Sequence, residues 1–143
     1  MKKILFICTG NTCRSPMAEA IARKLDKNLE VKSAGLFAVQ GSDISPFAKK
    51  VLQENDIFHQ HQSTPFTKEV ADWADLILTM TKFHKDYIVG QYLDLRHKVF
   101  SLKEFVKAEG MDVSDPYGGS IDTYRRTYQE LYDLITKLED QLY

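Results

Sequence analysis

The chain has 143 residues, of which 43% are hydrophobic and 27% are charged. This length and apolar content suffice to bury a core, and no linker-like stretch interrupts the sequence, so we predict a single domain over residues 1–143. The formal net charge is −1, from 19 basic and 20 acidic residues spread along the chain. This balance excludes the basic footprint expected of a protein that binds nucleic acid or a membrane surface.

The first residues of the sequence bear on where in the cell the protein is located. Lys2 and Lys3 precede an apolar run that is too short for a signal peptide or a transmembrane span. We therefore expect a cytoplasmic protein whose two cysteines stay reduced. The sequence does not indicate an oligomeric state.

Strand and helix patterns alternate along the chain. Residues 3–8 predict a buried strand, and residues 16–25 predict a helix with apolar residues on one face. Further strands are predicted at 30–34, 75–80 and 98–102, and further helices from Ser45, over 84–92 and from Ser120. This order predicts an α/β fold, a doubly wound four-stranded parallel sheet with flavodoxin-like strand order, whose ligand site lies at the carboxyl ends of the strands.

The segment after the first predicted strand, Cys8-Thr9-Gly10-Asn11-Thr12-Cys13-Arg14-Ser15, has the features of an anion site. A cysteine and an arginine on a loop between a strand and a helix bring together a sulfur, backbone N–H groups and a guanidinium that fits a tetrahedral oxyanion. Cysteines at helix N-termini beside a fixed positive charge are commonly thiolates at neutral pH. We therefore predict that Cys8 is a nucleophile and that Arg14 holds a transferring phosphoryl group.

The other residues of this loop are predicted to shape the anion site. Gly10 and Asn11 tolerate positive φ, so the loop can turn N–H groups inward, and the Asn11 side chain can pin the turn. Ser15 precedes Pro16 and is predicted as a helix N-cap, although its hydroxyl can instead turn toward the Cys8 sulfur. The predicted substrate-binding residues of the loop are Thr9, Gly10, Asn11, Thr12, Cys13 and Ser15.

A proton donor for the leaving group is predicted in the segment Ser114-Asp115-Pro116-Tyr117-Gly118-Gly119. Pro116 keeps Asp115 out of helical geometry, and Tyr117 can form a wall of the substrate slot. General acid catalysis by a carboxyl such as Asp115 is typically worth about 10²–10⁴-fold. Without the cysteine loop, this segment would be interpreted as an ordinary turn.

With the loop at residues 8–15 and the Asp115-Pro116-Tyr117 motif, the chain resembles the low-molecular-weight protein tyrosine phosphatases over nearly its whole length. The resemblance implies phosphorylated protein substrates, a phosphocysteine intermediate on Cys8, and no metal or organic cofactor. It also implies that Asn11 and Ser33 support the loop, that Ser15 assists the reaction at Cys8, and that Asp115 acts first as acid and then as base.

Two departures from the tyrosine-specific members indicate a subgroup. Thr12 stands where those members usually carry isoleucine, and Gly118 stands where many carry a second aromatic residue. In both respects, and over residues 33–35, 79–81 and 118–120, the chain resembles the bacterial protein arginine phosphatases. A threonine hydroxyl can hydrogen-bond a guanidinium, whereas an isoleucine side chain would leave the N–H donors of the guanidinium unpaired. The alternatives are a tyrosine phosphatase of the same family and an incidental, space-filling Thr12.

Other interpretations fit the sequence less well. Cys8 could be a buried structural thiol, but the strand and helix context of the motif is present. A nucleotide-binding loop would need Gly-Lys-Ser/Thr or G-x-G-x-x-G, and the sequence contains neither. An arsenate reductase would need cysteines beyond Cys8 and Cys13. A non-catalytic phospho-binding module would gain nothing from a nucleophile combined with an acid.

Three further predictions concern residues around the loop. Cys13 could form a reversible disulfide with Cys8 under oxidation, or could pack behind the loop. Phe37 could line the substrate entrance or serve as plain packing. His59 and His61 are interpreted as part of a solvated loop rather than as a metal site.

Overall fold

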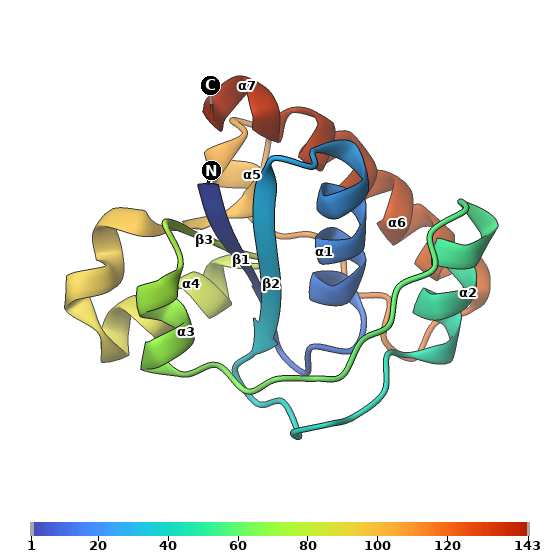
Figure 1. The fold of residues 1–143 in the computed structure, drawn as a ribbon, viewed down its shortest axis with the longest axis horizontal. Helices are drawn as coiled ribbons and strands as arrows, with labels where there is room; N and C mark the ends of the chain where they lie inside the picture. The colour runs from blue at the N-terminus through green and yellow to red at the C-terminus, as the bar shows by residue number, and fades with distance from the viewer. Residues whose placement is uncertain (1, 143) are drawn as a thin grey trace.

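The computed structural model describes residues 2–142 as a parallel sheet with helices on both faces (Figure 1). Its strands are β1 (Lys2–Cys8), β2 (Leu29–Gly35), β3 (Leu76–Thr79) and β4 (Val99–Ser101), in the order β2-β1-β3-β4. The central strand β1 pairs with β2 on one side and with β3 on the other. This arrangement confirms the predicted doubly wound, flavodoxin-like fold.

The helices cover the two faces of the sheet unequally. Their bounds are α1 (Arg14–Leu25), α2 (Pro46–Glu54), α3 (Lys68–Trp73), α4 (Lys82–Gln91), the 3-10 helix η1 (Leu93–Lys98), α5 (Leu102–Phe105), α6 (Ile121–Thr136) and α7 (Leu138–Leu142). Helices α1, α2, α6 and α7 contribute to the larger apolar cluster, and α3, α4 and η1 contribute to the smaller one. Within residues 2–142, no helix is long and apolar enough to cross a membrane.

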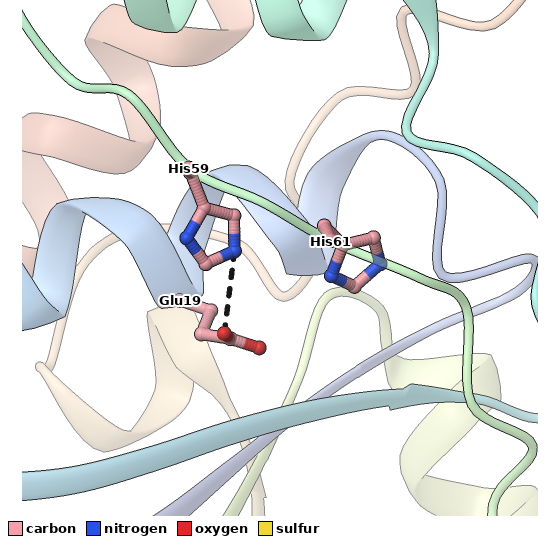
Figure 2. A group of neighbouring side chains, drawn as sticks. All are labelled: Glu19, His59 and His61. Carbon is pink, nitrogen blue, oxygen red and sulfur yellow. Dashed lines mark ion pairs between the residues drawn. The ribbon is translucent and has the colours of Figure 1, made fainter.

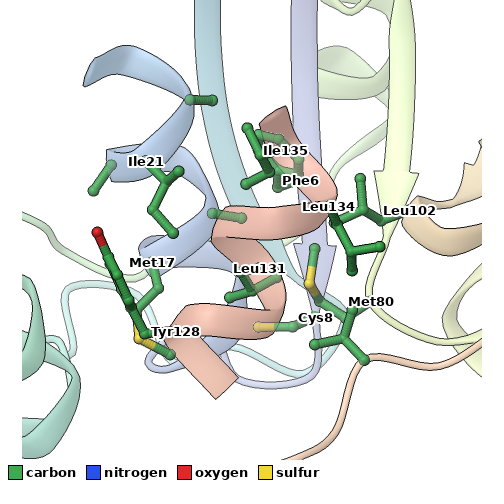
Figure 3. Packing of buried hydrophobic residues seen from close by; sticks show 14 of the residues in the cluster. Phe6, Cys8, Met17, Ile21, Met80, Leu102, Tyr128, Leu131, Leu134 and Ile135 are labelled. Carbon is green, nitrogen blue, oxygen red and sulfur yellow. The ribbon is translucent and has the colours of Figure 1, made fainter. Parts of the chain in front are cut away.

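The side chains of β1 alternate between these two clusters. Ile4, Phe6 and Cys8 face the larger cluster, and Leu5 and Ile7 face the smaller one. Figure 3 shows Phe6 and Cys8 among the side chains of α1 and α6. Because a central parallel strand is covered on both faces, it appears in the sequence as a continuous apolar run. Cys8 is the last residue of that run.

The structure differs from the predicted elements mainly at helix ends. Helix α1 begins at Arg14, with Cys13 as its N-cap, so the prediction that Ser15 caps this helix is wrong. Ser120 does cap α6, since its side chain accepts a hydrogen bond from Thr123 N. The sequence patterns missed α3, α5, η1 and the separate α7, which have six residues or fewer and show too little periodicity.

Candidate active site

The predicted anion loop lies at the carboxyl end of β1, where the chain enters α1. Asn11 adopts the left-handed conformation with φ of 56°, which its tolerance of positive φ allows, whereas Gly10 lies outside that region. The end of β2 packs closely against this turn. A Cβ on Gly35 would lie 2.6 Å from Thr9 O and 2.8 Å from Asn11 N, so this position needs glycine.

The sulfur of Cys8 is buried at the N-terminal end of α1. Its residue is 4% exposed, and Sγ lies 2.8 Å from Ser15 Oγ. The Ser15 hydroxyl therefore turns toward the sulfur, which was the predicted alternative to a role as helix cap. A hydroxyl in this position can donate to a thiolate, and the helix N-terminus favours the same negative charge.

The side chain of Asn11 connects the loop to β2. Its Nδ2 donates to Ser15 Oγ at 2.8 Å and to Ser33 Oγ at 2.9 Å, while its Oδ1 accepts from Thr64 N at 2.9 Å. Asn11 is fully buried, and these three bonds satisfy both polar atoms of its side chain inside the protein, as burial requires. The structure thus contains the hydrogen bonds that loop support by Asn11 and Ser33 requires.

The backbone carbonyl of Asn11 is held by residues that the sequence analysis did not assign to the site. It accepts hydrogen bonds from Ser63 Oγ and from His61 Nε2, both at 2.8 Å. His61 is half-buried and its ring stacks on that of His59 with centroids 5.8 Å apart. The side chain of His59 is only 7% exposed. The prediction that these histidines belong to a solvated loop is therefore wrong.

A buried carboxylate lies behind this network. Glu19 Oε1 accepts from Ser33 Oγ at 2.7 Å, and its Oε2 lies 3.2 Å from an Arg23 nitrogen and 3.3 Å from His59 Nε2. Burial acts to raise the pKa of Glu19, but His59, Ser33 and Arg23 outweigh it and hold this pKa below its usual value. The sequence signal for this cluster was the His-x-His spacing, and Glu19 carried none.

The predicted acid approaches the predicted phosphate clamp. Arg14 Nη1 donates to Val113 O at 3.1 Å, and Nη2 lies 3.6 Å from Asp115 Oδ2. Asp115 Oδ1 accepts from Tyr117 N at 3.1 Å, which closes the turn locally. The Arg14 side chain is 6% exposed and that of Asp115 is 56% exposed. A buried guanidinium and a carboxyl open to solvent therefore flank the same point.

A groove borders the loop on the side of Thr12 and Cys13, and its lining also includes Tyr117 and Gly118. Thr12 is half-buried there, and Tyr117 is 81% exposed. Cys8 is not among the described residues that line this groove. That Tyr117 forms a wall of the slot stays a prediction.

Phe37 adjoins the loop at Thr9. It is 56% exposed, and its ring meets Tyr87 edge to face with centroids 5.4 Å apart. Its backbone N donates to Thr9 O at 2.9 Å, so it adjoins the loop directly. Its place at the substrate entrance stays a prediction.

His84 is a further contact of the loop that sequence reasoning missed. Its Nε2 lies 2.9 Å from Thr9 Oγ1, and its Nδ1 lies 2.9 Å from Thr81 Oγ1. Burial, with a smaller effect of Arg14, lowers the pKa of His84 to about 4. The ring is therefore neutral at neutral pH, so one of its nitrogens carries a hydrogen and the other can accept one. An isolated histidine gives no sequence signal for such a role.

Cys13 packs behind the loop against α6. Its Sγ lies 3.4 Å from Tyr124 Oη, which also accepts a hydrogen bond from Ser45 Oγ at 3.3 Å. Burial and the neighbouring Cys13 raise the pKa of Tyr124 to about 12, so the phenol stays protonated. Both cysteines are free, and a disulfide between Cys8 and Cys13 stays a prediction.

Comparison with known proteins gives consistent matches over nearly the full chain. The family described as low molecular weight phosphotyrosine protein phosphatase matches residues 3–143. A protein-arginine-phosphatase of Geobacillus stearothermophilus is 48% identical over 141 residues, which cover 98% of this chain and 95% of that protein. The low molecular weight protein-tyrosine-phosphatase PtpB of Staphylococcus aureus is 45% identical over 139 residues, covering 96% and 97% of the two chains.

A solved structure extends this comparison. It contains a cysteine-to-serine mutant of the YwlE arginine phosphatase with a phosphorylated active site serine. That chain is 46% identical, superposes with a TM-score of 0.94, and the match covers 98% of this chain and 95% of that one. Such identity over such a length, on the same fold, shows common descent rather than a shared topology alone. The chain belongs to the low molecular weight phosphotyrosine protein phosphatase family and is a cysteine-based phosphatase.

Proposed function

We propose that this phosphatase hydrolyses phosphoarginine residues in proteins through a phosphocysteine intermediate on Cys8. The observation that carries the proposal is the position of the Cys8 sulfur, 2.8 Å from Ser15 Oγ at the start of α1. On the same loop, Arg14 lies 3.6 Å from Asp115. These two contacts support the assignment of Cys8 as nucleophile, Arg14 as anion clamp and Asp115 as proton donor.

In the first step, the Cys8 thiolate attacks phosphorus, a P–S bond forms and the P–N bond to the substrate guanidine breaks. The protonated carboxyl of Asp115 gives its proton to the departing nitrogen. The loop N–H groups and Arg14 stabilise the charge on the equatorial oxygens throughout. In the second step, Asp115 takes a proton from water, which attacks the phosphocysteine and releases phosphate and the thiolate.

The choice of phosphoarginine is supported by Thr12 and Gly118. Both line the groove beside the loop, where Thr12 offers a hydroxyl and Gly118 leaves room that a second aromatic side chain would fill. The 48% identical relative named as a protein-arginine-phosphatase supports the same choice. The phosphorylated serine of the YwlE mutant supports a covalent intermediate at the equivalent nucleophile.

A tyrosine phosphatase is the second candidate. Two exposed aromatic residues, Phe37 and Tyr117, flank the loop and could stack on the flat ring of a phosphotyrosine. The 45% identical PtpB protein is named as a protein-tyrosine-phosphatase. The two candidates share the chemistry at Cys8 and differ in what the groove beside Thr12 recognises.

The separating experiment compares Thr12→Ile and Thr12→Val with the parent protein on phosphoarginine and phosphotyrosine peptides. Losing the hydroxyl leaves a guanidinium donor unpaired, which costs roughly 1–3 kcal/mol. We expect kcat/KM for phosphoarginine to fall by about five- to more than a hundredfold, with phosphotyrosine turnover unchanged or improved. The Val variant removes the hydroxyl at nearly constant volume.

Asp115→Asn is measured on both substrates as a control. Cleavage of the P–N bond needs a proton on the departing nitrogen more than release of a phenol needs a proton, so loss of the acid could also lower phosphoarginine turnover selectively. A parallel loss of both activities in the Thr12 variants would make Thr12 a scaffold residue and would favour the tyrosine phosphatase.

We also propose that the enzyme works in the cytoplasm on phosphorylated proteins. A thiolate nucleophile and a second free cysteine are best kept in a reducing compartment. The net charge of −1 gives no support for a nucleic acid partner.

A further inference from the structure

Behind the anion loop, three side chains with metal-binding atoms converge. We propose that Glu19, His59 and His61 bind a divalent transition metal ion of the zinc class. Their ligand atoms all lie within 4.8 Å of one another. Figure 2 shows the two imidazole rings next to each other, with the carboxylate of Glu19 below His59. Two histidines and a glutamate are a donor set that zinc uses.

The spacing of these atoms is close to what an ion requires. Zinc bonds of about 2.0–2.2 Å in tetrahedral geometry separate the ligand atoms by roughly 3.4 Å. His59 Nε2 and Glu19 Oε2 are 3.3 Å apart, so this pair already has the required separation. His61 lies on the same loop segment as His59, and its ligand atom lies within 4.8 Å of the other two.

His59 supplies an independent observation that points to a ligand at this cluster. Its side chain is 7% exposed, and within the part of the chain that the structure describes its Nε2 makes no hydrogen bond. This nitrogen faces Glu19 Oε2, but the pair is not aligned as a hydrogen bond. A buried polar atom without a partner is uncommon and unfavourable. A metal ion bound to both atoms would give His59 Nε2 the partner that it lacks.

His61 presents its second nitrogen in the form that a metal needs. Its Nε2 lies 2.8 Å from the carbonyl oxygen of Asn11, and because a carbonyl only accepts, Nε2 carries the hydrogen. In the neutral ring, Nδ1 is then the atom with a free lone pair. Metal-bound histidines typically donate their other N–H to a carbonyl or carboxylate, as His61 does here.

Glu19 is also held so that one oxygen remains for a metal. Its Oε1 accepts from Ser33 at 2.7 Å, which leaves Oε2 facing His59. Arg23 is the competing cation, with a nitrogen 3.2 Å from this oxygen. The Arg23 side chain is 51% exposed and its Nη2 also donates to Val31 O at 2.8 Å, so it keeps a partner when a metal takes Oε2.

The proposed ligand atoms are not the atoms that hold the loop. Asn11 and Ser33 are bound by His61 Nε2 and Glu19 Oε1, whereas the metal would take His61 Nδ1 and Glu19 Oε2. Occupancy therefore leaves the loop bonds intact. It would fasten the segment that carries both histidines onto α1, so we expect the ion to stabilise the folded protein.

The test uses the full chain with Cys8→Ser, because a free active-site thiolate would itself bind zinc. Calorimetric titration with Zn²⁺ should show one saturable site, and the Tm should rise with Zn²⁺. Since losing even an outer partner of a metal ligand typically weakens binding by about 10–100-fold, His59→Gln should raise the Kd by at least about 100-fold and remove the Tm shift. Glu19→Gln should act in the same direction. His97→Gln, which changes an exposed histidine elsewhere, should alter neither value.

A second measurement covers the case in which His59→Gln does not fold. Co²⁺ added to the Cys8→Ser protein should give visible d–d bands without a thiolate charge-transfer band, as nitrogen and oxygen ligands require. A thiolate band would place the ion at Cys13 and overturn the proposal. So would zinc binding that His59→Gln leaves unchanged, or the absence of saturable binding, which would make the cluster an ion pair only.

Discussion

The anion loop (residues 8–15) and the segment that carries the proposed acid Asp115 (residues 112–119) meet where Arg14 approaches Asp115, but the two segments are held in opposite ways. In residues 8–15, Asn11 and Ser15 are fully buried and Arg14 is 5% exposed. In residues 112–119, the chain is anchored at its start, where Val113 N donates to Met80 O at 2.7 Å. Its tip is exposed, and local bonds such as Tyr117 N to Asp115 Oδ1 close it.

This difference separates two tasks. Binding the phosphoryl oxygens needs donors fixed before the substrate arrives, because reorganising them during the reaction would cost energy. The proton donor must instead reach a leaving group that is connected to a protein and open to solvent. We therefore expect changes in the anion loop to affect both stability and activity, and changes at Asp115 to affect activity alone.

The largest effect is expected from Cys8→Ser, which replaces the nucleophile without disturbing the fold. Turnover of p-nitrophenyl phosphate should fall by roughly 10⁴-fold or more, as in other hydrolases that lose their nucleophile. The circular dichroism spectrum and the binding of sulfate should be retained. Activity near that of the parent protein would contradict a covalent mechanism through Cys8.

Asp115→Asn should come next, and its effect should depend on the leaving group. We expect a loss of about 10²–10⁴-fold for poor leaving groups and a much smaller loss for good ones, because only poor ones need a proton. Since the side chain is 56% exposed, the free energy of unfolding should change by no more than about 0.5 kcal/mol. Equal slowing across a series of aryl phosphates would remove Asp115 from the acid role.

Asn11→Ala tests how the buried anion loop is stabilised. The change leaves Ser15, Ser33 and the Thr64 N–H without their partner. We expect a loss of about 2–4 kcal/mol in the free energy of unfolding, measured by urea titration, together with reduced kcat.

Asn11→Gly is the matched control for Asn11→Ala, because glycine accepts the φ of 56° but cannot make the side-chain bonds. If the Gly variant were as stable as the parent protein, backbone conformation rather than hydrogen bonding would be the main contribution of Asn11.

The smallest effect is expected from the titration of His84. Its pKa is lowered to about 4 in the folded state from an ordinary value near 6.5, so the unfolded chain binds a proton that the folded protein does not. Stability should therefore be unaffected above pH 6.5 and should fall as pH decreases toward 4, by up to about 3 kcal/mol. In His84→Gln this component of the acid sensitivity should be absent. An unchanged pH dependence would show that His84 titrates normally.

The sequence determined the parts of this protein whose signals are local. The apolar run of β1, the spacing of Cys8 and Arg14 and the cap at Ser120 each depend on neighbouring residues, and the structure contains all three. Helix α5 also carried a local signal, since Ser101 and Glu104 form a capping box that could have revealed it. Helices as short as α3 leave too little periodicity to detect.

Only the tertiary structure decided what surrounds the loop. Local preference favours Ser15 as a cap, but bonds to Cys8 and Asn11 inside a buried site outweigh that preference. Contacts such as Asn11 with Ser33 join residues that the parallel sheet brings together at one edge. Likewise, His61 and His84 reach the loop from segments 50 or more residues away. Such contacts depend on how strands and helices pack, and no pattern among neighbouring residues encodes them.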